Sequence, residues 1–481
     1  MGIFLKEHIA CQLLLTEDFN LIEEKDRKNY LLNHSLEKIK PRKFKTERGK
    51  DYHCFSCKIS DNEVVLNSDY FVGVDWLTSD RFIHVEPKLN FSVVEVFESA
   101  LQSPEKVSED ETVNFNKDAE IKISQENRHK EVDVIAMLMQ IMSHSEVAKE
   151  TDKLLLIDWE ASEILIEQKQ DLLTPFLVVK FLNLVKDITR KGLKKSYYKV
   201  QENLRNRVKG KILVGPQIKQ NVFKNRFSNT VCEYQVFGED SIENRFLKKV
   251  FIFCTQYVEN NTYFFKDKND ISLMINYIRP TLEHINPVVD LQEIKHFKHN
   301  PFFKEYKEAI KIGQQILKKF AYNITKTTDE KTSTPPFWID MPKMFELYVY
   351  AKFIEDNPNL TSKNLKYQYA TYGNSLDFLI CAGDIKIVVD SKYKLKYNYS
   401  HIHEDIRQLA GYARLNIVKQ EQPITKEEID CLIIYPKPIE NNKYSGSLNI
   451  DFLLNKQDGI KNYYKVFKLG IALPVVTAKI S

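Results

Sequence analysis

The most constraining feature of the sequence is a stretch near its C-terminal end in which isolated charges interrupt an apolar pattern. Residues 376–393 read LDFLICAGDIKIVVDSKY. Two short apolar runs, the second rich in β-branched side chains, predict two β-strands. Gly383 lies between the runs, where it can adopt the positive φ of a tight turn, so we expect the strands to form a hairpin.

Three charged side chains of this hairpin are candidate site residues. Asp377 precedes the core of the first apolar run, and Asp390 and Lys392 follow the second run. Because side chains two residues apart in a strand point to the same face, Asp390 and Lys392 should lie together. The hairpin can bring Asp377 beside them. Burying such charges is costly unless they are paired or bind a metal ion.

Two carboxylates and one lysine suit metal-assisted cleavage of a phosphodiester bond. Carboxylate oxygens are ligands that Mg²⁺ prefers, and Mg²⁺ lowers the pKa of a bound water and stabilises charge on a phosphate. A lysine can orient or deprotonate that water, or neutralise charge in the transition state. The alternative is a hairpin whose charges lie at exposed ends.

The pattern of Asp377 followed by Asp390-x-Lys392 on the next strand resembles the core of PD-(D/E)XK nucleases. Leu376 stands where that motif usually has proline. The resemblance implies that Asp377 and Asp390 bind Mg²⁺ and that Lys392 acts on the attacking water. We therefore expect a Mg²⁺-dependent DNA endonuclease.

The segments that flank the hairpin favour the same core. Residues 341–356 and 403–418 have the apolar periodicity of helices, and a strand is expected at Cys431–Tyr435. Helix, hairpin, helix and strand give the αββαβ order of a restriction-endonuclease-like core. The prediction for the whole chain is a multidomain α/β protein that ends in this core.

The two flanking helices contribute three more candidates. Glu346 either adds a carboxylate to the metal site or is a surface residue near a helix start, where the dipole favours acids. Gln408 and Tyr412 are four residues apart, so they share one helix face. Their spacing resembles the Q-x-x-x-Y motif of several nuclease lineages, which implies a catalytic role for Gln408 and a DNA-facing role for Tyr412.

Composition limits the class of protein and its compartment. The chain has 481 residues, with 43% hydrophobic and 28% charged residues, which is typical of a soluble globular protein. The 70 basic and 66 acidic residues nearly balance, so the net charge of +4 does not by itself indicate nucleic-acid binding. Seven scattered cysteines, the lack of a signal-like N-terminus and the lack of a long apolar stretch predict a cytoplasmic protein that does not enter a membrane.

Three domains are expected along the chain. Residues 1–125 look like a β-rich N-terminal domain, and residues 126–325 like a mainly helical middle domain with a basic segment. Residues 326–336 are polar and proline-tipped, a suitable linker into the nuclease domain at residues 326–481.

Two basic clusters stand out. One, within residues 38–50, is either a solvated loop or surface hairpin, or an arm that contacts a partner or nucleic acid. The other, at residues 191–211, is interleaved with two tyrosines and is either a DNA-binding segment or a solvated helix and turn. The residues predicted to bind DNA are Lys194, Lys195, Arg205, Arg207, Lys209, Lys211, Lys394 and Tyr412.

The order of motifs over roughly residues 65–470 resembles the McrC family, the nuclease subunit of modified-cytosine restriction systems. A glycine-containing strand leads to a Pro-Lys turn, and a glycine-basic turn, a C-x-Y strand and an N-R helix start follow in the family's order. In this chain these segments are Val72-Gly73-Val74, Val85-Glu86-Pro87-Lys88, Lys209-Gly210-Lys211, Cys232-Glu233-Tyr234 and Glu243-Asn244-Arg245.

This resemblance implies a subunit of a complex. McrC-like chains dock through their N-terminal part onto McrB, an AAA+ GTPase ring that recognises modified DNA, and they stimulate GTP hydrolysis and cut double-stranded DNA. The chain has no Walker A sequence, so GTP is expected to bind to the partner. The implied function is cleavage of methylated DNA in phage defence.

Two alternatives remain open. One is a stand-alone DNA-repair-type nuclease without a motor, and the other is a non-catalytic activator of an AAA+ partner. The complete set of Asp377, Asp390 and Lys392 argues against the second, because an inactive site has no reason to retain buried charges. A neighbouring reading frame for an AAA+ GTPase would favour the restriction subunit.

Overall fold

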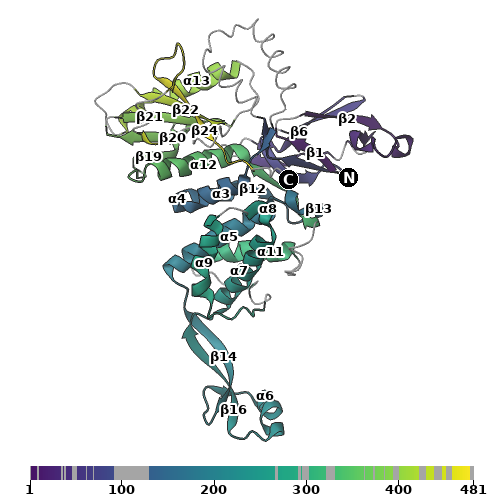
Figure 1. The fold of residues 1–481 in the computed structure, drawn as a ribbon, viewed down its shortest axis with the longest axis vertical. Helices are drawn as coiled ribbons and strands as arrows, with labels where there is room; N and C mark the ends of the chain where they lie inside the picture. Colours follow the sequence, from purple (N-terminus) through teal and green to yellow (C-terminus); the bar gives the residue numbers. More distant parts are fainter. Residues whose placement is uncertain are drawn as a thin grey trace. The chain divides into compact units, whose positions relative to one another are not determined.

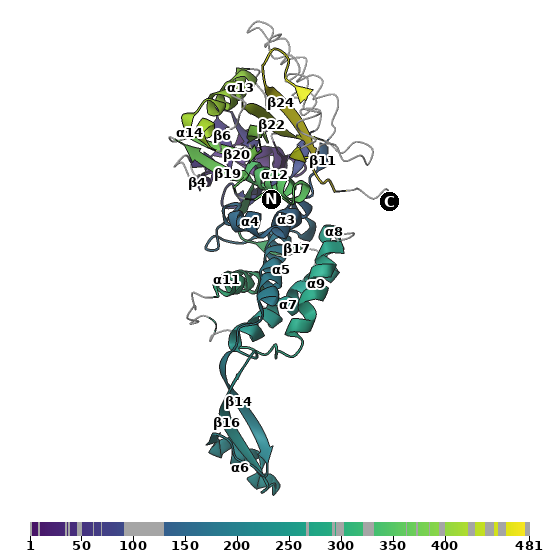
Figure 2. The ribbon, with the colours of Figure 1, turned by 90° about the vertical axis from the view of Figure 1, so that its left-hand side faces the viewer.

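The computed structural model describes residues 2–476 with gaps at 8–9, 34–35, 37–38, 46–50, 61, 69, 91–128, 266–268, 291–293, 295–302, 321–330, 362, 372–373, 384, 394–399, 422–428, 438–446 and 451–457. The chain divides into two compact units. The first unit comprises Met1–Leu165 and Ser333–Ser481, and the second comprises Ile166–Thr332. Figures 1 and 2 show the elements of each unit in two views. In the described part of the chain, no helix has both the length and the apolar character that crossing a membrane requires.

A six-stranded sheet in the first unit contains the predicted hairpin. The hairpin strands β20 and β21 are antiparallel, and β21 pairs in parallel with β22, which pairs in parallel with β24. Gly383 has a φ of 58° at the turn, as its position between the two runs predicted. In sheet order the strands are β19 (Leu365–Thr371), β20 (Asn374–Ala382), β21 (Ile385–Ser391), β22 (Asp430–Lys437), β24 (Val466–Ala472) and β23 (Asp458–Gly459).

Helices precede and follow the hairpin in the predicted order. Helix α12 (Met341–Asp356) begins where the Asp340 carboxylate accepts a hydrogen bond from the Lys343 backbone N–H, a typical N-cap. Helix α13 (Ser400–Ala413) follows β21 and precedes β22 in the chain, and it contacts both strands. Parallel strands need such a crossover connection, which is usually a helix. A short helix, α14 (Asn416–Gln420), follows α13.

The remaining strands of the first unit form two further sheets and two short ribbons. One sheet has the order β1 (Gly2–Lys6), β9 (Phe82–Glu86), β8 (Phe71–Trp76), β18 (Phe337–Asp340) and β12 (Leu155–Ile157). The other has the order β3 (Tyr30–Leu32), β2 (Ala10–Thr16), β7 (Glu63–Ser68) and β6 (Phe55–Ile59). The ribbons are β4 (Lys43–Lys45) with β5 (Asp51–His53), and β10 (Lys88–Asn90) with β11 (His129–Glu131).

Strand β18 explains the glycine of the Val72-Gly73-Val74 segment. Gly73 of β8 lies opposite Trp338 of β18. A Cβ atom on Gly73 would lie 2.1 Å from the carbonyl oxygen of Phe337, so only glycine allows the two strands to come this close. The segment that leads into α12 is therefore part of the N-terminal sheet.

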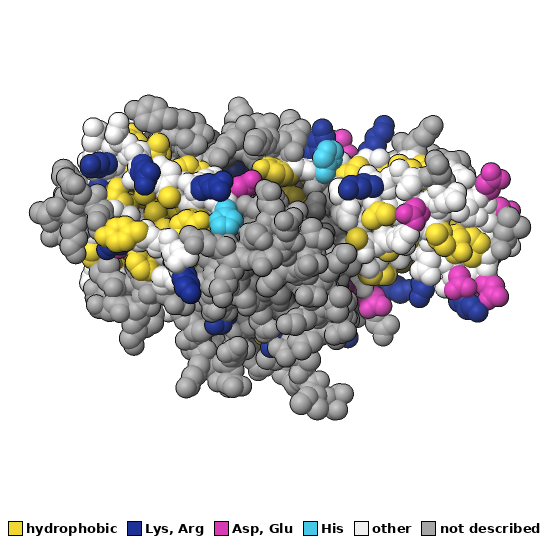
Figure 3. All heavy atoms as spheres, turned by 90° about the horizontal axis from the view of Figure 1, so that it is seen from above, with side chains coloured by type: hydrophobic (Ala, Val, Ile, Leu, Met, Phe, Trp, Pro, Cys, Tyr) yellow, Lys and Arg dark blue, Asp and Glu magenta, His cyan; other side chains and the backbone are white. Residues whose placement is uncertain are grey.

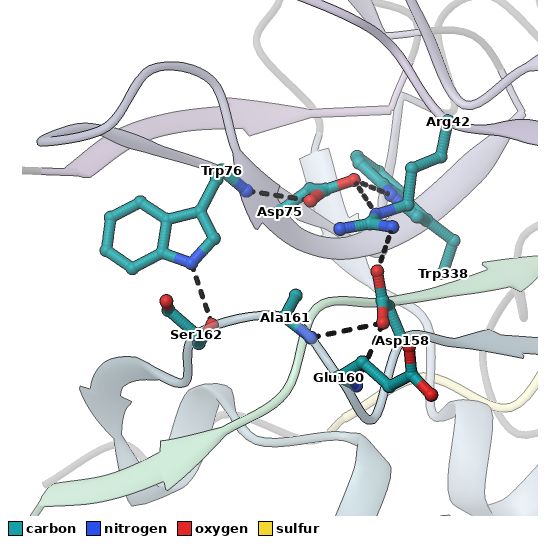
Figure 4. A network of polar contacts seen from close by, with 8 residues as sticks. All are labelled: Arg42, Asp75, Trp76, Asp158, Glu160, Ala161, Ser162 and Trp338. Carbon is teal, nitrogen blue, oxygen red and sulfur yellow. Dashed lines mark hydrogen bonds and ion pairs between the residues drawn. The ribbon is translucent and has the colours of Figure 1, made fainter.

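A polar network joins distant parts of the first unit (Figure 4). The Asp75 carboxylate accepts hydrogen bonds from the Arg42 guanidinium at 2.7 Å and from the Trp338 indole at 3.0 Å. Arg42 also donates to Asp158 at 2.5 Å, and Asp158 accepts the backbone N–H groups of Glu160 and Ala161. Arg42 belongs to the basic cluster at residues 38–50, so at least this member is held inside the fold.

The second unit combines helices with a projecting β-structure. Helix α5 packs against α7, α9 and α11. The helices are α5 (Leu173–Lys191), α7 (Ile242–Asn260), α8 (Thr262–Phe265), α9 (Asn269–Leu282) and α11 (Lys304–Lys319). Strands β13 (Ile164–Glu167) and β17 (Lys331–Thr334), where the chain passes from one unit to the other, pair with each other. Shorter helices among the described residues include α3 (Val134–Ser143) and α4 (Ser145–Ala148) of the first unit, and the 3-10 turns at Phe19–Leu21, Arg27–Asn29, Lys149–Lys153, Gln168–Gln170 and Val222–Lys224.

The predicted basic segment forms part of a long β-ribbon, which we call the arm (residues 196–238). Strand β14 (Ser196–Arg205) pairs along its whole length with β16 (Asn229–Gly238), and β15 (Lys211–Ile212) and α6 (Val214–Gln220) lie between them in the chain. Figures 1 and 2 show the arm extending away from the helices of the same unit. The alternative of a basic helix and turn is therefore wrong for β14.

The two units differ from the three predicted domains, whose boundaries lay at residues 125 and 325. Helices α3 and α4 pack against α12, and β12 pairs with β18, so segments of all three predicted domains join in the first unit. These contacts link residues far apart in the sequence, and local periodicity contains no signal for them.

We predict that Glu7 makes the stability of the first unit depend on pH. Its side chain is buried and accepts a hydrogen bond from the Tyr393 hydroxyl; burial raises its pKa from 4.5 to about 8, against the smaller effect of that hydrogen bond. The folded chain then retains a proton that the unfolded chain releases, so this contribution to stability is present below pH 4.5 and is lost as pH rises through about 8. Thermal unfolding of wild type, Glu7→Gln and the exposed control Glu17→Gln over this range should show the smallest loss of stability for Glu7→Gln. Parallel curves for all three proteins would contradict the assignment.

We also predict that Asp75→Ala strongly destabilises the first unit. The substitution leaves the buried Trp338 indole without its acceptor and leaves Asp158 as the remaining carboxylate partner of Arg42, which should cost about 1–3 kcal/mol of unfolding free energy. The matched control is Glu160→Ala, because the exposed Glu160 contributes only its backbone N–H to the network. Denaturant unfolding followed by tryptophan fluorescence measures both, and equal midpoints would show that the network adds little.

Candidate active site

The hairpin register brings the three predicted charged residues together. Phe378 pairs with Val389, and the next step of this antiparallel register places Asp377 opposite Asp390. Opposite residues of an antiparallel pair direct their side chains to the same face. One Asp377 carboxylate oxygen accepts hydrogen bonds from both the backbone N–H and the hydroxyl of Ser391, each at 2.8 Å. Asp377 is thereby fixed at the end of β21.

Lys392 lies between two carboxylates. Its ammonium nitrogen is 2.6 Å from Asp390 Oδ2 and 3.4 Å from Asp405 Oδ1. The side chains of Lys392, Asp390 and Asp405 are only 12%, 12% and 9% exposed. Asp405 comes from α13 and was not predicted. The signal that could have identified it is an acid three residues before Gln408, on a helix predicted to cover the hairpin.

The pKa values of the site reflect burial and close charges. Burial raises the pKa of Asp390 to about 7, with Lys392 acting in the opposite direction. Burial, together with the charge of Glu346, raises the pKa of Asp377 to about 6, while the Ser391 hydrogen bonds lower it. Burial alone would lower the pKa of Lys392, but the charges of Asp390 and Asp405 outweigh that effect and raise it. Burial and neighbouring carboxylates therefore disfavour the ionised forms of Asp377 and Asp390. A bound cation would stabilise these ionised forms.

Glu346 faces this cluster from α12. Its side chain is 13% exposed, and the same carboxylate oxygen accepts hydrogen bonds from the Gln368 side-chain amide and from Lys343 at 3.3 Å. Its charge acts on Asp377, so the two carboxylates are close. Glu346 is thus half-buried and paired, and its part in a metal site stays a prediction.

Gln368 is a further residue that the sequence did not reveal. It has a φ of 48°, a left-handed conformation that is uncommon for residues other than glycine. Because Tyr367 pairs with Phe378 and Tyr369 with Leu376, Gln368 lies across from Asp377. Ser375 donates to the Gln368 side-chain carbonyl at 2.7 Å, and the amide group donates to Glu346. The left-handed backbone at Gln368 thus places its side-chain amide between Ser375 and Glu346, two residues near Asp377.

The predicted pair on α13 shares one helix face. The Gln408 side-chain amide donates to the Tyr412 hydroxyl at 2.6 Å, with Gln408 exposed and Tyr412 buried. Asp405 lies one helical turn before Gln408. Nothing in this geometry tests the catalytic role of Gln408 or the DNA contact of Tyr412, which stay predictions.

Asp377 and Asp390 are the residues that best fit a divalent metal ion. Within the described ranges, no group of three or more His, Cys, Asp or Glu side chains is arranged to hold a metal. Mg²⁺, however, commonly uses one or two carboxylates and completes its shell with water and phosphate oxygens. Two neighbouring buried carboxylates with raised pKa values meet that requirement, because a cation would offset their burial and their repulsion. The carboxylate of Glu346 is held by Lys343 and Gln368.

The residues predicted to bind DNA differ in their environments. Arg205, Arg207, Lys209 and Lys211 are exposed on the arm, whereas Lys194 forms a largely buried ion pair with Glu243 at 2.5 Å. Lys195 is exposed and lies 3.6 Å from Glu239, and Lys394 is outside the described residues. On the face shown in Figure 3, the visible Lys and Arg side chains are dispersed among hydrophobic and acidic ones. DNA binding stays a prediction for this set.

Comparison with known proteins identifies the family. The profile of the family described as McrBC 5-methylcytosine restriction system component matches residues 91–436, more than half of the chain. A similar solved structure is the half-complex from the tetradecameric assembly of Thermococcus gammatolerans McrB AAA+ hexamers with bound McrC, with 13% identity and a TM-score of 0.35 over 98% of this chain and 94% of that chain. Another is the McrBC complex of the same organism, with 11% identity and a TM-score of 0.27 over 75% of this chain and 89% of that chain. No protein with a curated description matches.

The match to this profile defines the class of protein as a restriction-system component. More particularly, the chain belongs to the McrBC 5-methylcytosine restriction system component family. The recognition of the McrC family from the order of short motifs is thereby confirmed.

We predict that this site binds divalent metal more weakly at lower pH. With pKa values of about 7 for Asp390 and about 6 for Asp377, protons compete with a cation as pH falls through this range. Lys392, Glu346 and Asp405 are the other charged groups that act on them. Calorimetric titration with Mn²⁺ should give an affinity at least about tenfold lower at pH ~6 than at pH ~8. A constant affinity would show that these carboxylates do not bind the ion.

Proposed function

We propose that the chain is the endonuclease subunit of a nucleotide-driven restriction complex that cleaves methylated double-stranded DNA by Mg²⁺-dependent phosphodiester hydrolysis. The supporting observation is the meeting of Asp377, Asp390 and Lys392 in one buried cluster at the end of two strands. Family membership supplies the restriction context. It also disfavours the stand-alone DNA-repair nuclease.

Each side chain has a role that its geometry supports. Asp377, held by Ser391, and Asp390 would bind Mg²⁺, with Glu346 as an additional carboxylate. Bound Mg²⁺ would activate water and stabilise charge on the phosphate. Lys392 would orient the attacking water or neutralise the phosphate in the transition state. Gln408, exposed on α13, would help to position the water or the DNA strand.

The nucleotide and the choice of DNA site would come from a partner. We propose a McrB-like AAA+ GTPase ring, because the family is defined as part of a multi-component restriction system and this chain has no phosphate-binding loop sequence. Double-stranded DNA would contact exposed basic residues of the arm, such as Arg205 and Arg207. The N-terminal strands are the predicted docking surface for the ring.

The arm is a second candidate contact with the ring. Between β15 and β16 it exposes several large apolar side chains, and apolar side chains gathered on a surface are typical of protein-binding sites. They are Val214, Ile218, Val222, Phe223 and Phe227, and Phe223 and Phe227 are 79% and 74% exposed.

The test is Asp390→Ala in the complex with a McrB-like AAA+ GTPase as the partner. Cleavage of methylated plasmid with GTP and Mg²⁺ should fall at least about 100-fold, because the proposed metal loses a ligand. Partner binding and stimulation of GTP hydrolysis should stay as in wild type. The matched control is Glu404→Ala, an exposed acid next to Asp405 on α13.

The outcomes separate the competing functions. An Asp390→Ala complex that still cuts DNA would refute the site assignment. A wild-type chain that stimulates GTP hydrolysis yet never cuts modified DNA would instead support the non-catalytic activator.

A further inference from the structure

Lys392 and a metal ion would compete for the same carboxylate. The ammonium nitrogen lies 2.6 Å from Asp390 Oδ2, which is hydrogen-bonding distance. Under the proposed function, Asp390 also binds the divalent cation, and a cation bound through Oδ2 would repel the ammonium group at this distance. In that arrangement Lys392 loosens its contact with Asp390.

A released Lys392 still needs a negative partner. Its side chain is only 12% exposed, so bulk solvent compensates poorly for the lost ion pair, and a buried ammonium group without a carboxylate partner is strongly unfavourable. Asp405 Oδ1 is already 3.4 Å from the ammonium nitrogen. Because Asp405 belongs to α13 and Asp390 to β21, Lys392 can approach one carboxylate while it leaves the other.

The charges of the cluster also suit this exchange. When ionised, Asp377, Asp390 and Asp405 bring three negative charges, and Lys392 brings one positive charge. The nearby Glu346 has its own cation in Lys343. One divalent cation would therefore neutralise the cluster, but only if Lys392 stays and is paired with Asp405.

We propose that Asp405 is a positioning residue that holds Lys392 when Asp390 binds a divalent cation, so that the ammonium group stays in the site without blocking the metal. This inference rests on the proposed function, because it assumes that Asp390 is a metal ligand. It assigns Asp405 a role in metal binding through Lys392, and no direct contact with the metal.

The experiment is a double-mutant cycle on Mn²⁺ affinity of the full-length chain, measured by calorimetry without DNA. Lys392→Met removes the competing ammonium group and should tighten Mn²⁺ binding. Asp405→Asn leaves Lys392 on Asp390 and should weaken binding about tenfold, a typical size for groups in direct contact. In the Lys392→Met background, Asp405→Asn should change the affinity by less than about twofold. Glu404→Gln, on the same helix, is the exposed control and should match wild type.

Four results would overturn the proposal. An equal loss of affinity from Asp405→Asn in both backgrounds would make Asp405 a metal ligand or a structural residue. Unchanged binding by Asp405→Asn, or weaker binding by Lys392→Met, would show that Lys392 does not compete. If Asp405→Asn fails to fold, Asp405→Glu keeps the charge and should bind Mn²⁺ within about threefold of wild type, and a larger loss would contradict the proposal.

The same data separate this proposal from the proposed function. A wild-type chain that binds no Mn²⁺ would remove the metal site, and both conclusions would fall. Binding by wild type and loss of binding by Asp390→Asn, with additive effects of the Lys392 and Asp405 substitutions, would refute only the role of Asp405.

Discussion

The pairing of β20 with β21 is the constraint on which the rest of the site depends. This register places Asp377 and Asp390 on one face, and the same pairing buries Phe378 and Val389 between them and the turn. A slip by one residue would turn one acid to the opposite face and expose part of the apolar core. Burial of the apolar side chains of the hairpin therefore stabilises a register in which the carboxylates of Asp377 and Asp390 repel each other.

The charged cluster is surrounded by parts of the first unit that are far apart in the sequence. Helix α12, which bears Glu346, starts directly after β18, and the backbone N–H of Met341 donates to Tyr70 O at 3.1 Å. On the other side, the Tyr393 hydroxyl, next to Lys392, donates to Glu7 at the end of β1. Two strands of the N-terminal sheet therefore lead directly to residues beside the site.

Sequence patterns were sufficient for the local parts of this arrangement. The hairpin, the turn at Gly383 and the helices around it follow from apolar periodicity, and the gathering of Asp377, Asp390 and Lys392 follows from strand geometry. Asp405 and Gln368 could not be found in the same way. Asp405 acts through a contact between a helix and a strand, and Gln368 through a left-handed backbone that its residue type does not indicate. Likewise, the pairing of β18 with β8 depends on contacts between residues about 260 positions apart, beyond the reach of any local pattern.

The discontinuity of the first unit has a consequence for synthesis of the chain. Its two segments, Met1–Leu165 and Ser333–Ser481, are separated by the whole of the second unit. Because domains fold as units while the ribosome elongates the chain, the second unit is complete before the last strands of the first have been made. Until then the N-terminal strands lack β18, and the edge of β8 has no neighbour on that side. While the ribosome translates the second unit, the edge of β8 in the nascent chain is therefore open to pairing with other chains.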